Sequence, residues 1–317
     1  MSPAATRPTS TRPETTRPAP VRPGSGRPVR RIALALAAVA LPILGVGPRA
    51  AVAVPGAVTY SAPGLRCSVT DPRLREISGM VTSADGLYVL NDKAPAAIFG
   101  LDWNCQVRKV IDLGLRVYDT EDLGRSPDGT LWVGDIGGNV YRRPSVLLDK
   151  RTPDGTVSTV QLDYPDGPHD AEALMISQLG DAVIVTKQRD GHSGIYTVPL
   201  LAGVPRHELR FAGSLDLRAM RPSSKASVLV TGGAVAAGGR HVVIRTYSDA
   251  YEWDAPDGNI VAAMLAGPPR TIPLAPTRQG ESITYSIDGR YLLTSTEKLP
   301  APLHAVTITR PVAPPAR

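Results

Sequence analysis

The fold of this chain is decided by residues 121–133, Glu121-Asp122-Leu123-Gly124-Arg125-Ser126-Pro127-Asp128-Gly129-Thr130-Leu131-Trp132-Val133. An acidic residue opens a short apolar run, a glycine follows eight residues later, and an apolar strand sequence comes next. The dipeptide Asp128-Gly129 is one of the strongest short-range signals for a β-hairpin turn. The stretch therefore predicts two antiparallel strands joined by a tight turn.

Five copies of this pattern follow one another along the chain. They begin at Ser78, Glu121, Glu172, Thr231 and Glu281 and reach their turn glycines at Gly86, Gly129, Gly180, Gly239 and Gly289. A repeat of about this period, built of hairpins and without helical periodicity, is typical of the blades of a β-propeller. We therefore predict an all-β fold of five blades with four antiparallel strands each. A sixth, degenerate blade inside residues 172–231 is the alternative.

The last repeat ends near Ile308 after three predicted strands, and an isolated strand sequence, Ala57-Val58-Thr59-Tyr60, precedes the first repeat. A blade with an unpaired edge invites aggregation, so the ring needs a closing strand. We predict that residues 57–66 supply the outer strand of the fifth blade. In the third repeat we expect strands at 171–177, 182–187, 194–200 and 208–215.

The first 53 residues differ in kind from the rest. Residues 1–31 form an Arg-Pro-rich segment that we expect to be a disordered leader, with Arg30-Arg31 as a positive n-region. Residues 32–53 have the apolar run and small-residue end of a secretory signal, with cleavage expected after Ala53. An uncleaved anchor is the alternative, and either the Sec or the Tat route would fit. Residues 54–317 then form the propeller domain.

The net charge of +6 comes from the N-terminal segment and not from the predicted propeller domain. Residues 1–53 hold eight arginines and one glutamate, so residues 54–317 hold 27 basic and 28 acidic residues. A nearly neutral mature chain without a basic cluster does not favour nucleic acid as a partner. We expect a secreted or cell-envelope monomer, without a stable membrane span after cleavage, whose partner is a small ligand or an extracellular protein.

The chain has two cysteines, Cys67 and Cys105. In an exported protein an even count of this kind predicts a disulfide. Here it would hold the junction between the last blade and the first. Two free buried thiols are the alternative.

In a propeller, the residues that begin the inner strands and those that end the second strands surround one mouth of the central channel. These positions give a candidate ligand site made of Glu121, Asp135, Glu172, Lys187, Arg245 and Glu281. Carboxylates drawn toward one axis repel each other unless a cation, a basic side chain or a proton neutralises them. The candidate ligands for Ca²⁺, a cation that prefers oxygen donors, are Asp119, Glu121, Glu172 and Glu281.

Three interpretations of this mouth stay open on the sequence: a structural ring of ion pairs, a bound cation, or catalytic carboxylates. Gly137-Gly138 permits backbone close to a ligand. Tyr247, Tyr251 and Trp253 form either an aromatic wall near the mouth or part of the core. No Gly-x-Ser-x-Gly nucleophile motif is present in the sequence.

Three pairs of segments resemble a group of exported bacterial propeller proteins described as WD40-like or as phytase/esterase-like. The pairs are Asp119–Leu123 with Gly134–Asn139, His169–Leu174 with Thr186-Lys187, and Thr231–Val235 with Arg245-Thr246-Tyr247. The resemblance implies an exported propeller with a cation at the channel mouth. Gly138 stands where this group would have an acidic residue, and residues matching phytase catalysis are not recognisable.

The primary prediction for function is a non-catalytic binding or interaction module with a small ligand or Ca²⁺ at the channel mouth. The second is a metal-assisted hydrolase, phytase- or esterase-like, that uses Glu121, Glu172 and Glu281 as ligands or as acid and base groups. The third is a protein-docking scaffold.

Overall fold

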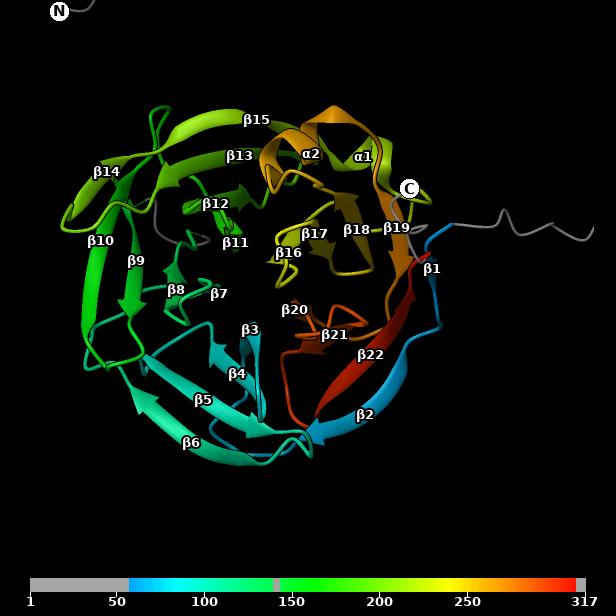
Figure 1. Cartoon of the computed structure of the whole chain (residues 1–317), viewed down its shortest axis with the longest axis horizontal. Helices are drawn as coiled ribbons and strands as arrows, with labels where there is room; N and C mark the ends of the chain where they lie inside the picture. The colour runs from blue at the N-terminus through cyan, green and yellow to red at the C-terminus, as the bar shows by residue number, and fades with distance from the viewer. Residues whose placement is uncertain (1–56, 139–142, 312–317) are drawn as a thin grey trace, which may run out of the picture. The chain divides into compact units, whose positions relative to one another are not determined.

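The computed structural model describes residues 57–138 and 143–311. The predicted leader and signal segment, residues 1–53, lie outside the described residues. The sheets are arranged radially around a central channel, each as one blade of a propeller (Figure 1). The predicted five-bladed fold is therefore confirmed.

The first blade contains β3 (Ile77–Ser83), β4 (Gly86–Asn91), β5 (Ala97–Asp102) and β6 (Val107–Asp112). The second contains β7 (Asp122–Arg125), β8 (Leu131–Asp135), β9 (Val146–Arg151) and β10 (Val157–Asp163). The third contains β11 (Ala171–Ile176), β12 (Asp181–Thr186), β13 (His192–Pro199) and β15 (Arg210–Asp216).

The fourth blade contains β16 (Val230–Val235), β17 (His241–Thr246), β18 (Asp249–Asp254) and β19 (Arg270–Pro273). The fifth contains β20 (Gly280–Tyr285), β21 (Tyr291–Thr296) and β22 (Ala301–Thr309), and the N-terminal strands β1 (Thr59–Tyr60) and β2 (Gly64–Val69) complete it. Two short helices, α1 (Leu217–Met220) and α2 (Ile260–Ala266), follow β15 and β18.

The ring closes as predicted, but with a longer closing segment. Both β1 and β2 pair antiparallel with β22, from Thr59 opposite Thr309 to Val69 opposite Ala301. Pro63 lies between the two pieces, and a proline has no N–H to donate to a strand ladder. The closing strand is therefore interrupted there and extends three residues beyond the expected 57–66.

Residues 172–231 contain no sixth blade in the described structure. The extra strand in this interval, β14 (Arg206–Glu208), pairs in parallel with β10 of the second blade. Arg206 Nε donates to Asp163 Oδ2 at 2.6 Å across that edge. The outer strand of the third blade was predicted at 208–215 and is observed as β15 (Arg210–Asp216). It begins later than predicted because the residues before β15 form β14, which pairs with the edge of the second blade.

The core lies between the blades. Leu174 and Ile184 of the third blade pack in one buried cluster with Trp132 and Leu148 of the second. Tyr251 and Trp253 are buried in the cluster between the third and fourth blades, so they belong to the core. No helix in the described residues is long and apolar enough to cross a membrane.

A buried carboxylate reinforces the closure. Glu252 on β18 is fully buried and accepts hydrogen bonds from the hydroxyls of Tyr60 at 2.5 Å and Tyr285 at 2.8 Å. Arg270 and Arg310 form ion pairs with the same carboxylate. The closing strand β1 is therefore linked to the fourth and fifth blades by polar contacts that the repeat pattern did not indicate.

Candidate functional site

The first residues of the inner strands lie side by side, as the repeat predicts. Ser78 Oγ donates to the Glu121 carbonyl oxygen at 2.5 Å, and Thr231 Oγ1 donates to the Gly280 carbonyl oxygen at 2.9 Å. Each bond joins two neighbouring blades near the start of their inner strands. The predicted mouth of the channel is therefore present, and the side chains of distant repeats meet there.

Lys187, which directly follows β12, is the cation at this mouth. Its ammonium donates to Glu172 Oε1 of β11 and, at 2.9 Å, to the hydroxyl of Tyr247 from the next blade. The same ammonium lies 5.1 Å from the centre of the Tyr247 ring. Tyr247 thus lines the mouth, in contrast to the core residues Tyr251 and Trp253. We define Glu121, Glu172, Glu281, Lys187 and Tyr247 as the mouth cluster.

The three glutamates of the mouth cluster are buried and their carboxyls hold protons more tightly than usual. Burial raises the pKa of Glu172 to about 8 and that of Glu281 to about 7, although Lys187 opposes both shifts. Burial, together with the Glu172 and Asp119 carboxylates, raises the pKa of Glu121 well above its usual value. Three carboxyls around one ammonium, with Arg245 as a further cation that acts on Glu281, cannot all ionise cheaply in a low-dielectric site.

Lys187 itself stays charged. Burial disfavours its ammonium, but the Glu172 carboxylate outweighs that effect and leaves the pKa of Lys187 above its usual value. The mouth therefore presents a permanent cation and a phenol hydroxyl beside carboxyls that titrate near neutral pH. This combination supplies proton donors and acceptors within one site.

Two carboxylate oxygens of the mouth cluster have no hydrogen-bond partner in the described structure. They are Glu172 Oε2 and Glu281 Oε2, and both are buried. Buried polar atoms are nearly always satisfied, by the protein, by water or by a ligand. No described residue donates a hydrogen bond to either of these two oxygens.

Gly137 lies directly against the carboxylates of Asp119 and of Glu121 in the mouth cluster. A Cβ at Gly137 would lie 2.6 Å from Asp119 Oδ2 and would also clash with Glu121 Oε1. A side chain at position 137 would force both carboxylates to move from these positions. The glycine that the sequence suggested for its backbone freedom thus allows the backbone to approach these two carboxylates closely.

Two predicted ligand residues are occupied by structural contacts. Asp135 is fully buried, accepts from the backbone N–H groups of Tyr118 and Asp119 at 2.9 Å each, and forms an ion pair with Arg143 at 2.7 Å. Arg245 is buried against carbonyl oxygens, including that of Ser282 at 2.8 Å, and burial lowers its pKa to about 10. Both side chains are held by protein groups, although the charge of Arg245 also acts on Glu281. We leave them out of the mouth cluster, and ligand binding by either stays a prediction.

Asp122, next to Glu121 of the mouth cluster, forms hydrogen bonds with the inner strands of other blades. Its carboxylate accepts from its neighbour Leu123 N at 2.8 Å, from Leu174 N in the third blade at 2.9 Å and from Gly233 N in the fourth at 3.2 Å. Burial raises its pKa well above the usual value, and the three N–H groups oppose that shift. One acidic side chain thus ties three inner strands together, a role that sequence reasoning missed.

The opposite end of the channel holds a separate cavity of about 280 Å³. It is lined by the later residues of the inner strands, among them Met175, Val235 and Thr284, together with Arg125. The side chain of Asp122 contacts inner strands between the two ends. The acidic mouth and this far cavity are therefore distinct environments.

Within residues 57–138 and 143–311, no group of three or more His, Cys, Asp or Glu side chains is placed to hold a metal ion. The predicted set of Asp119, Glu121, Glu172 and Glu281 contains the right donor atoms, but Lys187 takes one of the Glu172 oxygens. A calcium site here stays a prediction.

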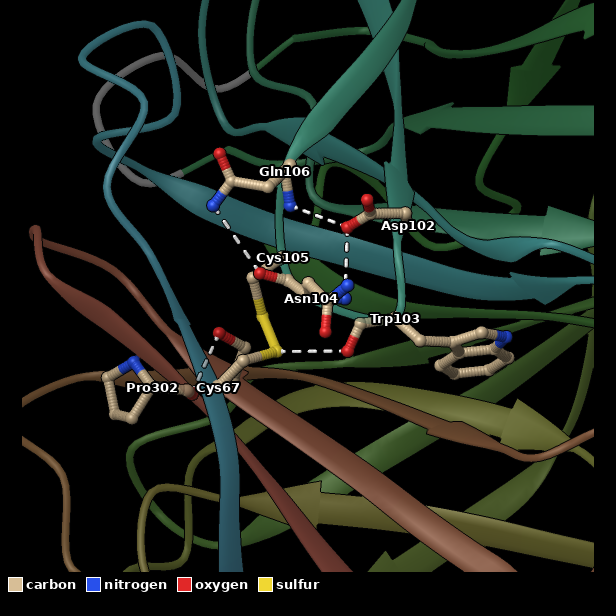
Figure 2. The surroundings of a disulfide bond; sticks show 8 residues. Cys67, Asp102, Trp103, Asn104, Cys105, Gln106 and Pro302 are labelled. Carbon is tan, nitrogen blue, oxygen red and sulfur yellow. Dashed lines mark hydrogen bonds between the residues drawn. A yellow bond between two sulfur atoms is a disulfide. The ribbon is translucent and has the colours of Figure 1, made fainter.

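The predicted disulfide is present. Cys67 on β2 and Cys105, between β5 and β6, are bonded with their Cα atoms 5.9 Å apart (Figure 2). The bond joins the closing strand of the fifth blade to the first blade, at the junction where the sequence placed it. Cys105 is almost completely buried.

No family model matches the chain, and no curated protein sequence matches it. Solved structures do. A gluconolactonase from Xanthomonas campestris has 16% identity and a TM-score of 0.46, covering 74% of this chain and 72% of its own. An aldose sugar dehydrogenase from Streptomyces coelicolor has 10% identity and a TM-score of 0.45, covering 80% and 99%. A virginiamycin B lyase from Staphylococcus aureus has 11% identity and a TM-score of 0.43, covering 80% and 100%.

These similar structures are all enzymes by name, and they contradict the first prediction for function, a non-catalytic binding module. The prediction failed because the sequence shows no catalytic motif, whereas propeller sites are assembled from single residues of separate blades. At this level of identity and TM-score the likeness concerns the fold and transfers no reaction. The chemistry must come from the mouth cluster itself.

Proposed function

We propose that this protein is a hydrolase and that the mouth cluster is its acid and base centre. The observation that carries the proposal is the pair of buried, unpartnered oxygens Glu172 Oε2 and Glu281 Oε2 beside the ammonium of Lys187. A water molecule held by such oxygens is a suitable nucleophile when one carboxyl is ionised. A carboxyl that remains protonated donates to the leaving group.

The pKa values of the two glutamates support one carboxyl acting as the base and another as the acid. With Glu281 near 7 and Glu172 near 8, the cluster holds both ionised and protonated carboxyls around neutral pH. The ionised carboxylate takes a proton from water as the water oxygen attacks the acyl carbon, and the protonated carboxyl gives a proton to the departing alcohol. The ammonium of Lys187 stabilises negative charge on the acyl oxygen.

The charge of the site favours certain substrates. Carboxylates of Asp119 and Asp170 act on Glu121 in addition to the cluster's own glutamates. A neutral or cationic carboxylic ester would enter this acidic mouth more readily than a phosphate ester, whose dianion is repelled. The proposed substrate class is therefore an uncharged or cationic ester.

The test compares 4-nitrophenyl acetate with 4-nitrophenyl phosphate, each with EDTA and with added CaCl₂. We expect turnover of the acetate, about a hundredfold or greater loss in Glu172→Gln, and no change in Glu208→Gln, an exposed control on β14. Loss of activity in EDTA would identify the metal-assisted form of the same hydrolase. Absence of ester turnover, or full activity in Glu172→Gln, would refute the proposal.

Three further proposals accompany this function. Action outside the cytoplasm is supported by the Cys67–Cys105 disulfide. A relationship to the exported phytase/esterase-like propellers is supported by the resemblance at residues 119–123 and 169–174. Binding of Ca²⁺ at Asp119, Glu121, Glu172 and Glu281 would have to displace Lys187 from Glu172, and a rise in melting temperature on adding Ca²⁺ would reveal it.

A further inference from the structure

A second pocket lies on the face of the propeller opposite the acidic mouth. It has a volume of about 520 Å³ and is bounded by Trp103 of the first blade, Arg66 of the closing strand, and Ile287, Asp288, Tyr291 and Leu303 of the fifth blade. Ser83, the last residue of β3, also lines it, and this is the end of the inner strand away from the mouth cluster. We name it the interblade pocket.

Large apolar side chains are unusually accessible here. The side chain of Trp103 is 46% exposed and that of Ile287 is 48% exposed. The other two tryptophans, Trp132 and Trp253, are 5% and 4% exposed. Single exposed apolar residues are ordinary on a protein surface, but two that line one pocket of ligand size indicate a binding site.

The disulfide fixes one wall of the interblade pocket against the other. Cys105 holds the turn between β5 and β6 to β2, and Cys67 Sγ lies 3.5 Å from the carbonyl oxygen of Trp103. Asp102 Oδ1 accepts from the backbone N–H groups of Asn104 and Gln106 at 2.9 Å each. Figure 2 shows the indole of Trp103 directed away from this braced turn. The indole is therefore presented from a rigid support.

Some polar side chains at the pocket already have hydrogen-bond partners in the protein, and others do not. Ser286 Oγ donates to Asp288 Oδ1 at 2.6 Å and accepts from Tyr291 N at 3.0 Å. That hydrogen bond from Ser286 holds the pKa of Asp288 below its usual value, so Asp288 is ionised. The guanidinium of Arg66 lies 5.7 Å from the centre of the Tyr291 ring and has no ion-pair partner in the described part of the chain. Arg66 is thus the donor left for a ligand.

We propose that the interblade pocket binds a small molecule with an apolar ring and a carboxylate. The ring would lie against Trp103, Ile287 and Leu303, and the carboxylate would pair with Arg66. A planar guanidinium matches a carboxylate with two parallel hydrogen bonds. A polyhydroxylated ligand fits less well, because Ser286 Oγ and Asp288 Oδ1 are already hydrogen-bonded to each other. This site is independent of the proposed hydrolase centre.

The test uses 2-naphthoate, and 2-naphthamide as its uncharged counterpart, with the oxidised full chain. Because Trp103 is the exposed tryptophan, bound 2-naphthoate should protect tryptophan fluorescence from acrylamide quenching in a saturable way, and calorimetry should give the same Kd. We expect Arg66→Gln to weaken 2-naphthoate binding by about tenfold or more and to change 2-naphthamide binding by less than about twofold. Arg240→Gln, an exposed arginine outside this pocket, is the matched control.

Each outcome decides the question. Saturable protection of Trp103, lost with the charge of Arg66 and kept in Arg240→Gln, supports the site. Absence of saturable binding, equal loss in both arginine variants, or binding that leaves the quenching of Trp103 unchanged overturns it. Since none of these residues belongs to the mouth cluster, ester turnover should be the same in Arg66→Gln and the wild type.

Discussion

Reduction of the Cys67–Cys105 disulfide tests how the ring is held closed, without changing any residue. The two cysteines are 38 positions apart. Opening a cross-link of that span returns conformational entropy to the unfolded chain worth about 4 kcal/mol at 25 °C. Since domains are stable by roughly 5–15 kcal/mol, the bond contributes a large share of the free energy of unfolding.

The folded state should survive this change. β2 keeps its antiparallel ladder with β22, from Gly64 opposite Ala305 to Val69 opposite Ala301, and Glu252 still holds β1 through Tyr60. The loss should therefore appear in the stability of the fold and leave its secondary structure unchanged.

Equilibrium urea unfolding, followed by circular dichroism with and without a phosphine reductant, measures the effect. We expect the midpoint to fall by roughly 1–2 M urea, given a slope of about 2–3 kcal/mol per M. The variant Cys67→Ser/Cys105→Ser should unfold near the reduced midpoint and show no response to the reductant. A loss below about 1 kcal/mol would falsify the loop-closure reasoning.

Asp122→Ala should lower the free energy of unfolding by about 3 kcal/mol or more, because three buried N–H groups lose their acceptor; an unchanged melting temperature would contradict this. Tyr285→Phe should cost about 1–2 kcal/mol in urea unfolding, since the buried Glu252 loses a hydroxyl donor; a variant as stable as the wild type would show that this hydroxyl is dispensable. Stability should fall as the pH rises from about 5 to 8. Burial raises the pKa of Glu281 to about 7 and of Glu172 to about 8, so the folded state favours the protonated carboxyls. That stabilisation is complete below their ordinary pKa values and is lost as the pH passes through the raised ones. Urea unfolding at several pH values should show a shallower slope for Glu281→Gln, and a flat wild-type profile would exclude the mechanism.

The mouth cluster was only partly visible in the sequence. The repeat alignment placed Glu121, Glu172, Glu281 and Lys187 around one channel mouth, and the structure brings them together. It also placed Asp135 and Arg245 there by the same counting of positions. Counting shows where a residue falls in a blade, but the direction of its side chain depends on the neighbours that it can pair with. Arg143, which binds Asp135, lies outside the repeat pattern.

The sequence by itself predicted the five-bladed ring, its closure by an N-terminal strand and the Cys67–Cys105 bond, and the structure removed the alternatives of a sixth blade and of free thiols. Hairpin turns and strand alternation are local signals, and a repeated local signal indicates how many equivalent sheets pack side by side. The tertiary structure decided which carboxyls are buried, which are satisfied and which keep an open oxygen. Those properties depend on the desolvation and charges supplied by other blades. Asp122 is the clearest case, because its partners Leu174 and Gly233 are 52 and 111 residues away in the chain and meet it only when the ring is closed.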